Sequence, residues 1–255
     1  MIEAESRTPK GQRIAIFSIA VLMIVSTIAL YAMVIIQDGN DRAEKTKQQD
    51  LEKQFSDKVD VRNAKADALR LELSGKYYDA FKGYKSKVKA YNANAVTELK
   101  TRDLKAGSGA KIDDDSEYAI YYIGWLPNET IFDSSLSDSS LAAPLSHQSD
   151  GTWVFSDGST GGVIEGWVEG IPGMKMGGVR EITIPSHKGY GETGAGESIP
   201  ANSPLKFIVM VIPMPKTVPY PAGTLDLCGK VYTETYGDEE TAMYYCQYYM
   251  NIIEE

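Results

Sequence analysis

The sequence is poor in residues that bind metals, with two cysteines and two histidines among 255 residues. Both cysteines, Cys228 and Cys246, lie within the last 30 residues, and no CxxC motif or Cys/His cluster occurs. Structural zinc sites are built from four such ligands at short, characteristic spacings. The sequence therefore predicts no metal site and no other cofactor, and it predicts that His147 and His187 lie at the protein surface.

Excess positive charge is missing as well, because the formal net charge is -9. General nucleic-acid binders carry basic patches, so the sequence predicts no nucleic-acid partner. The charge is also distributed unevenly. Residues 41–90 carry 13 basic and 9 acidic side chains, residues 96–215 carry 8 and 16, and residues 216–255 carry 2 and 7. This contrast indicates at least three segments of different character.

Charged residues are absent throughout the 23 residues from Ile14 to Ile36. A helix of this length spans roughly 34 Å, enough to cross the ~30 Å hydrocarbon core of a membrane. The run has no polar face, which argues against a buried core helix. It is longer than the apolar part of a cleaved signal peptide, and no small-residue cleavage site follows it. We therefore expect a short tail over residues 1–13 and an uncleaved transmembrane anchor over residues 14–36.

The orientation of this anchor depends on its flanking charges. Basic residues lie on both sides, and those that follow the span are diluted by acidic residues, so the positive-inside rule alone does not decide. The short tail, and Arg13 directly before the span, favour a cytoplasmic N-terminus. We therefore expect a single-pass protein of the cell membrane with the rest of the chain extracytoplasmic.

Proline is absent from residues 41–91, which are rich in Lys, Glu, Ala and Gln. These residues favour helices, so we expect a helical stalk over residues 37–95. Three interpretations of the stalk stay open: a plain spacer, a homodimer through the stalk, and a helical hairpin that turns at Ser74-Gly75. Apolar side chains recur at spacings typical of coiled coils, in a first series of Leu51, Phe55, Val59, Ala66, Leu69 and Leu73 and a second of Tyr77, Phe81, Tyr84, Val88 and Tyr91.

Beyond Val96 the pattern changes to short stretches of aromatic and β-branched residues, separated by segments rich in Gly, Ser and Asp. Such stretches are typical of β-strands, and we expect strands at residues 118–123, 179–184 and 205–212. One short helix is expected from Glu165 to Ile171, because Pro172-Gly173 would end it. Residues 96–215 are therefore predicted to form one compact, mainly antiparallel α+β domain.

Several short motifs follow one another in this domain, and each alone is weak evidence. Together, in this order and over about 115 residues, they make the domain resemble the FKBP family of peptidyl-prolyl cis/trans isomerases. The motifs are Tyr121-Tyr122-Ile123-Gly124, Phe132-Asp133-Ser134-Ser135, Val163-Ile164-Glu165-Gly166-Trp167, Gly170, Met176-Gly177-Gly178, Tyr190-Gly191, and Gly194 to Pro200 followed by Leu205-Lys206-Phe207.

The resemblance implies a bent antiparallel β-sheet wrapped around one short helix, with an apolar cup between them that binds the proline of a polypeptide substrate. Trp167 would form the floor of the cup and Asp133 would lie at its rim. The N–H of Ile164 and the hydroxyl of Tyr190 would donate hydrogen bonds to substrate carbonyls. Carried over to this sequence, the catalytic residues are Tyr122, Phe132, Asp133 and Tyr190, and the substrate-binding residues are Trp153, Val163, Ile164, Trp167, Ile199 and Phe207.

The sequence departs from the family pattern in three places, one of which is the loop after Tyr190, where Ala195 and Ser198 replace bulkier residues common in the family. An insert of residues 136–151 separates Phe132 from Trp153, so the position of Trp153 depends on an alignment across it. No arginine occurs between Asp133 and Arg180, although family members often provide one as a partner for the rim aspartate. We therefore expect Asp133 to be held in another way.

Two functions remain compatible with this resemblance. One is an isomerase that assists the folding of extracytoplasmic proteins, and the other is an FKBP-fold module that binds a proline-containing partner with little catalysis. The fold alone does not separate them. The nearly complete set of cup residues favours the isomerase.

Residues 216–255 form an extension outside the predicted domain, with a helix expected from Asp238 to Ile252. Cys228 and Cys246 are separated by 17 residues, and we expect a disulfide that joins a strand or loop around Cys228 to this helix. The alternative is two unrelated buried thiols. Closing a loop of this size contributes ~3 kcal/mol in the chain-entropy model. Because disulfides persist in oxidising compartments, the pairing supports the extracytoplasmic placement.

Overall fold

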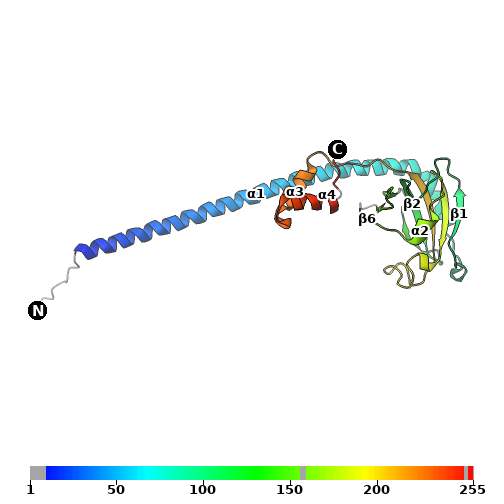
Figure 1. The fold of residues 1–255 in the computed structure, drawn as a ribbon, viewed down its shortest axis with the longest axis horizontal. Coiled ribbons are helices and arrows are strands. Elements are labelled where there is room, and N and C mark those ends of the chain that lie inside the picture. The colour runs from blue at the N-terminus through cyan, green and yellow to red at the C-terminus, as the bar shows by residue number, and fades with distance from the viewer. Residues whose placement is uncertain (1–9, 156–158, 250–251, 255) are drawn as a thin grey trace. The chain divides into compact units, whose positions relative to one another are not determined.

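The computed structural model describes residues 10–155, 159–249 and 252–254. The chain forms two compact units, which we call the stalk unit (residues 1–59 and 221–254) and the sheet unit (residues 60–220). Helix α1, Lys10–Lys82, contributes to both units and runs without a break (Figure 1). The turn considered at Ser74-Gly75 is therefore wrong, and so is the helical hairpin. The helix ends at Lys82, and the 3-10 turn η1, Gly83–Lys87, follows it.

The apolar part of α1 is long enough to cross a membrane. Its large apolar side chains from Leu22 to Ile36 are between 57% and 70% exposed, so this segment is not a buried core helix. The hydroxyls of Ser26 and Thr27 donate hydrogen bonds to the carbonyls of Leu22 and Met23. Such bonds back to the helix satisfy hydroxyls where no water is present, which suits a lipid environment.

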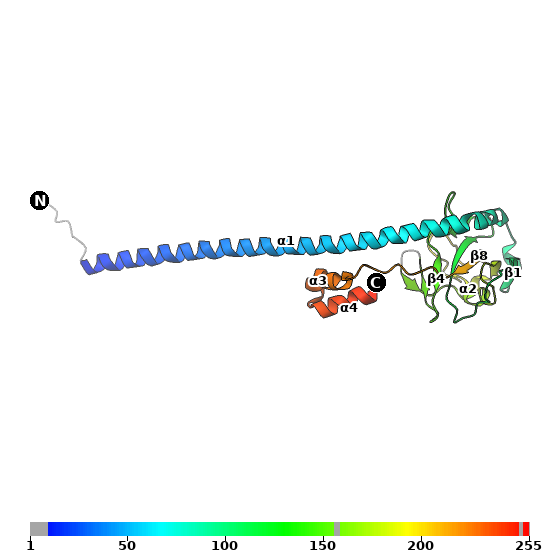
Figure 2. The same ribbon diagram turned by 90° about the horizontal axis from the view of Figure 1, so that it is seen from above.

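Two further helices complete the stalk unit, namely α3, Thr224–Tyr236, and α4, Glu239–Tyr249. They lie side by side along α1 (Figure 2). Gly237, with φ of 88°, ends α3 in the left-handed conformation that glycine adopts without strain. The helix expected from Asp238 to Ile252 is confirmed in its centre but is shorter, because Ile252 lies outside it. Helix α3 was not expected, so Cys228 lies on a helix rather than on a strand or loop.

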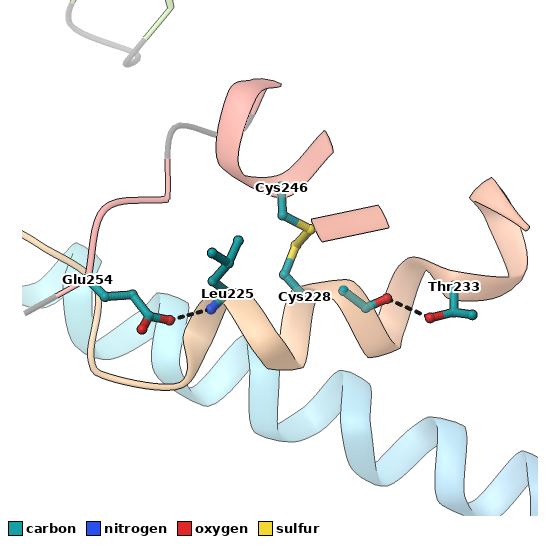
Figure 3. The surroundings of a disulfide bond; sticks show 6 residues. Leu225, Cys228, Thr233, Cys246 and Glu254 are labelled. Atoms are coloured by element: carbon teal, nitrogen blue, oxygen red, sulfur yellow. Dashed lines mark hydrogen bonds between the residues drawn. A yellow bond between two sulfur atoms is a disulfide. The ribbon is translucent and has the colours of Figure 1, made fainter. Parts of the chain in front are cut away.

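The pair α3–α4 is held together and against α1 by several contacts. Cys228 and Cys246 are joined by a disulfide between the two helices (Figure 3). Phe55 of α1 packs edge-to-face on Tyr232 with ring centroids 6.3 Å apart. Gln48 Nε2 donates to the carbonyl of Val231 at 3.0 Å. Phe55, one member of the first apolar series, therefore has a partner within its own chain, and the homodimer through the stalk stays a prediction without structural support.

The sheet unit contains an 8-stranded sheet in which every pairing is antiparallel, with the order β1-β7-β8-β2-β4-β5-β6 and β3 paired to β2. The short helix α2, Glu165–Gly170, lies against it (Figure 1). This confirms the predicted α+β fold and the three expected strands. The strands are β1 Lys100–Lys105, β2 Tyr118–Trp125, β3 Ile131–Ser134, β4 Leu145–His147, β5 Trp153–Val154, β6 Thr160–Gly161, β7 Val179–Ile184 and β8 Leu205–Pro213.

The central strands β2 and β8 are buried on both sides of the sheet. Successive residues of a strand point to opposite faces, so their side chains divide into two clusters. The front face, on which α2 packs, carries Tyr118, Ile120, Tyr122, Leu205, Phe207, Val209 and Val211. The back face carries Ala119, Tyr121, Ile123, Trp125, Ile208, Met210 and Ile212.

The end of α1 and the segment after it cover the back face. Phe81 is fully buried there, beside partly buried aromatic and apolar residues. The second apolar series of the stalk is therefore part of the core of the sheet unit and not a coiled-coil seam, which corrects our expectation. The residues of this series in the back-face cluster are Tyr77, Phe81, Tyr84, Val88 and Tyr91.

The insert of residues 136–151 also packs on the back face and forms hydrogen bonds with α1. Leu141 is fully buried in the back-face cluster, and its N–H donates to the Ser74 hydroxyl at 2.9 Å. The hydroxyl of Tyr78 donates to the carbonyl of Asp138. Further along the insert, β4 adds a strand beside β2. The insert therefore extends the sheet and fastens the end of α1 to it.

Candidate active site

Helix α2 approaches the sheet closely because two of its positions are glycine. A Cβ on Gly166 would lie 2.4 Å from Ile184 Cγ2, and one on Gly170 would lie 2.8 Å from Ile182 Cγ2. Both isoleucines belong to β7. Only glycine permits this approach, which brings Trp167, the residue after Gly166, onto the front face of the sheet.

Three aromatic rings contact Trp167, which is 5% exposed, and a fourth packs on one of them. The ring centroid of Trp167 lies 5.1 Å from that of Tyr122, 5.0 Å from that of Phe207 and 5.9 Å from that of Trp153. Phe132 packs on Phe207 at 5.5 Å with its ring nearly perpendicular. Such edge-to-face contacts are the favoured geometry for aromatic pairs, and they build an apolar site with Trp167 at its centre.

The structure brings the other predicted apolar residues to the same cluster. Ile199 is 5% exposed, and its backbone pairs with Ala195 in both directions. Val163 and Ile164 precede α2 and are partly buried against the cluster. The eight predicted apolar and aromatic residues in one cluster are Tyr122, Phe132, Trp153, Val163, Ile164, Trp167, Ile199 and Phe207.

The two polar candidates lie at the edge of this cluster. Asp133 is exposed, and Tyr190 is 38% exposed. The hydroxyl of Tyr122 donates to Asp133 Oδ2 at 2.5 Å, and the N–H of Ser134 donates to Asp133 Oδ1 at 2.8 Å. Tyr122 therefore holds the aspartate for which the sequence offered no arginine.

Burial and Asp133 together keep both tyrosines protonated. Burial, and then the hydrogen bond to Asp133, raise the pKa of Tyr122 well above its usual range. Burial, followed by the negative charge of Asp133, also raises the pKa of Tyr190. The hydroxyl of Tyr190 is therefore present as a hydrogen-bond donor across the physiological pH range.

Two N–H groups at this site have no acceptor within the described part of the chain. Nε1 of the buried Trp167 is one, and the backbone N–H of Ile164 is the other. Buried donors almost always have a partner, because leaving one unpaired costs about 1–3 kcal/mol. The site therefore offers donors to a ligand that brings carbonyl oxygens.

Two ionic groups that the sequence analysis missed hold α2 in place. Arg180 Nη1 donates to the carbonyls of Gly170 and Pro172 at 3.0 and 3.1 Å, while its Nε pairs with Asp103 at 2.6 Å. Lys188 pairs with Glu165, at the first position of α2. In the sequence, Arg180 stands out only as a basic residue within the mainly apolar strand β7. That position does not reveal which groups accept its hydrogen bonds.

His147 is not a surface residue, which corrects our expectation. It is 7% exposed and stacks on Tyr118 with ring centroids 4.7 Å apart. Its Nδ1 lies 2.9 Å from the carbonyl oxygen of Ser116. The ring also contacts Trp153 at 5.1 Å, so the insert places Trp153 between His147 and Trp167. His187 is exposed, as expected.

Comparison with known proteins gives consistent matches to the sheet unit. Residues 108–212 match the sequence profile of the FKBP-type peptidyl-prolyl cis-trans isomerases. An FK506-binding protein of Neisseria meningitidis serogroup A is 42% identical over 110 residues, which are 43% of this chain and 90% of that protein. A probable FKBP-type peptidyl-prolyl cis-trans isomerase of Haemophilus influenzae is 39% identical over 107 residues, which are 42% of this chain and 39% of that protein.

Among solved structures, a peptidyl-prolyl cis-trans isomerase of Pseudomonas syringae pv. tomato is similar at 27% identity. The match covers 54% of this chain and 92% of that chain, with a TM-score of 0.35. The profile match lies within the segment that carries β2 to β8 and α2.

Proposed function

The chain belongs to the FKBP-type peptidyl-prolyl cis-trans isomerase family, and from this premise we propose that its front-face cup isomerises X–Pro bonds in extracytoplasmic polypeptides. The observation that carries the proposal is the aromatic cluster around Trp167, with unpaired N–H donors on Trp167 and Ile164. An apolar site lined by aromatic rings suits the pyrrolidine ring of proline. The two N–H donors suit the carbonyl oxygens of a peptide.

The uncatalysed reaction is slow because amide resonance keeps the X–Pro bond planar. Isomerisation takes tens to hundreds of seconds without a catalyst. The planar ground state is more charge-separated than the twisted transition state. A cup without water disfavours the planar form more than the twisted form, and only such a difference between the two states accelerates the step. No covalent intermediate is required.

We assign the following roles within the cup. The face of Trp167 supports the proline ring, and Phe132 and Phe207 form walls around it. The N–H of Ile164 and the hydroxyl of Tyr190 donate to substrate carbonyls on either side of the twisting bond. Asp133, held by Tyr122, fixes one edge of the rim. These donors keep the flanking chain still while the bond rotates, which lowers the entropy cost of the reaction.

The test is an isomerisation assay with the full chain in non-ionic detergent. Peptides with a Leu–Pro bond are expected to exchange between cis and trans faster at micromolar protein, as measured by NMR exchange or protease-coupled absorbance. Phe132→Ala should lower this acceleration, because Phe132 is a cup wall that is only partly buried. If the wild-type chain binds the peptides but does not accelerate their exchange, the protein is a binding module instead.

We further propose that residues 14–36 anchor the protein in the cell membrane with the N-terminus cytoplasmic. The exposed apolar surface from Leu22 to Ile36 supports the anchor, and the disulfide between Cys228 and Cys246 supports an oxidising compartment. The test is alkylation of native membranes before and after reduction, followed by mass spectrometry. Labelling of both cysteines without reductant would contradict the extracytoplasmic placement.

A further inference from the structure

The segments that build the cup carry mostly acidic side chains on their exposed positions. Glu165 and Glu169 lie on α2, on either side of Trp167 in the sequence, and Asp133 lies on β3. Glu192 and Glu197 are exposed in the loop that joins Tyr190 to Ile199, two residues of the cup. These five carboxylates come from three of the segments that carry cup residues, while Tyr122, Trp153 and Phe207 lie on β2, β5 and β8.

None of these three segments carries a lysine or arginine. His187 and Lys188 lie in the turn before Tyr190, and Lys206, on β8, pairs with Glu181. Lys188 is paired with Glu165 at 2.8 Å and with Glu169. Its side chain is 21% exposed, against 58% for Glu165 and 43% for Glu169. Lys188 therefore offsets one of the two helix carboxylates, and the negative charges of Asp133, Glu192 and Glu197 have no basic residue on these segments to offset them.

A ligand is indicated independently by the floor of the cup. Trp167 is 5% exposed, and its Nε1 has no hydrogen-bond partner among the described residues. Buried donors rarely stay unpaired, and the carbonyl of a bound peptide is one acceptor that could pair with this one. The site thus combines a floor that accepts a peptide with a rim that attracts positive charge.

We propose that the cup selects X–Pro segments flanked by lysine or arginine. This inference rests on the proposed isomerase function and names its substrate class. Unpaired carboxylates around an apolar site raise the local concentration of cationic ligands. The attraction acts over about 30 Å at 0.01 M salt and only about 3 Å at 1 M salt, so the preference should fade as salt is added.

The experiment compares three peptides that share a Leu–Pro core and carry lysine, glutamine or glutamate two residues away on both sides. With the full chain in non-ionic detergent at ~0.01 M salt, kcat/KM should fall in the order Lys, Gln, Glu, with about three- to tenfold between the extremes. The difference should shrink to less than about twofold at ~1 M salt. NMR exchange measures all three peptides without a protease that has its own charge preference.

A pair of variants locates the effect. The double variant Glu192→Gln with Glu197→Gln should lose most of the preference for the lysine peptide and keep its rate on the glutamine peptide. The matched control, Glu234→Gln with Glu240→Gln, removes two exposed carboxylates from α3 and α4 and should keep the preference. Equal rates on all three peptides would overturn the inference and leave the isomerase standing. No acceleration of any peptide would overturn both.

Discussion

The two faces of the central sheet are built from the same strands, but the rest of the chain covers them to different extents. On the back face, Phe81 and the segment after α1 seal the apolar side chains, and Phe81 itself is fully buried. On the front face, Phe132, Val163 and Ile164 stay only partly buried, and Trp167 keeps a buried donor without a partner. Adjacent residues on β2, Tyr121 and Tyr122, belong to the two different faces.

This difference separates stability from function within one sheet. The aromatic cluster on the back face is buried by the chain itself. The cluster on the front face leaves Phe132, Val163 and Ile164 only partly buried and therefore accessible. Functional sites commonly break the rules of packing and polar satisfaction that the rest of a protein obeys. Both faces therefore contribute burial, but only the front face leaves side chains accessible to a ligand, and the predictions below test that division.

The largest expected effect comes from removing the cover of the back face. A fragment of residues 96–215, the domain expected from the sequence, lacks Tyr77, Phe81, Tyr84 and Tyr91. Losing one buried aromatic side chain costs ~3–5 kcal/mol, and a whole domain is stable by only about 5–15 kcal/mol. We expect this fragment not to fold cooperatively, as measured by circular dichroism during thermal and urea unfolding.

The matched control is the fragment of residues 60–220, which retains the end of α1 and the insert contacts to Ser74 and Tyr78. It should unfold in one cooperative transition. Equal unfolding midpoints for the two fragments would show that the back face does not depend on α1.

The next effect compares one large aromatic residue from each face. Phe81→Ala and Trp167→Ala each remove a buried ring, so each should lower the free energy of unfolding by ~3–5 kcal/mol. Only Trp167→Ala should lower kcat/KM, by at least about tenfold or 1.4 kcal/mol, because Trp167 is the floor of the cup. Urea unfolding and peptide exchange are measured at a temperature at which both variants are folded. A tenfold loss of activity in folded Phe81→Ala would contradict the division between the faces.

A smaller effect is expected from the hydroxyl of Tyr122. Its hydrogen bond to Asp133 has a charged acceptor, and such bonds contribute about 1.5–3 kcal/mol. Asp133 is exposed and can be hydrated instead, so Tyr122→Phe should lower the free energy of unfolding by about 1.5 kcal/mol. Asp133→Asn and the double variant complete a cycle that isolates the pairwise contribution. A coupling energy near zero would show that the two groups do not depend on each other.

Much of the front face could be predicted from the sequence, because short motifs with glycine fix its local geometry. Gly166 and Gly170 allow α2 to approach β7, and the motif around Trp167 carries both the helix and the floor of the cup. Strands β2, β7 and β8 were predictable because their apolar stretches are long, whereas the other five strands are shorter or polar and were not predicted.

The back face and α3 could not be predicted for a physical reason. Tyr77 and Phe81 recur at helical spacing, and that spacing is the same whether a helix packs on a second helix or on a sheet. The choice depends on Leu141 and Trp125, which are far away in the sequence. Helix α3 was missed because its sequence contains a glycine, three threonines and a valine, residues with low helix propensity, and it forms through packing and the disulfide.

The smallest effect is expected from the hydroxyl of Tyr121, the back-face neighbour of Tyr122. This oxygen is buried and has no hydrogen-bond partner among the described residues. Replacing an unsatisfied buried hydroxyl by hydrogen removes a cost instead of a bond. We expect Tyr121→Phe to leave kcat/KM unchanged and to change the free energy of unfolding by no more than about 1 kcal/mol, in the stabilising direction.

The same substitution has a signature at alkaline pH. Burial, and then the neighbouring Tyr77, raise the pKa of Tyr121 above the ordinary value of 10.0. Because the folded state holds this proton more tightly than the unfolded state, the stability it contributes is complete below pH 10 and falls as the pH rises above it. Tyr121→Phe should therefore lose less stability than the wild type between pH 10 and about pH 11, measured by urea unfolding at each pH. An equal loss in the two proteins would mean that the hydroxyl titrates alike in the folded and unfolded states and that the back face is less tightly sealed than its burial indicates.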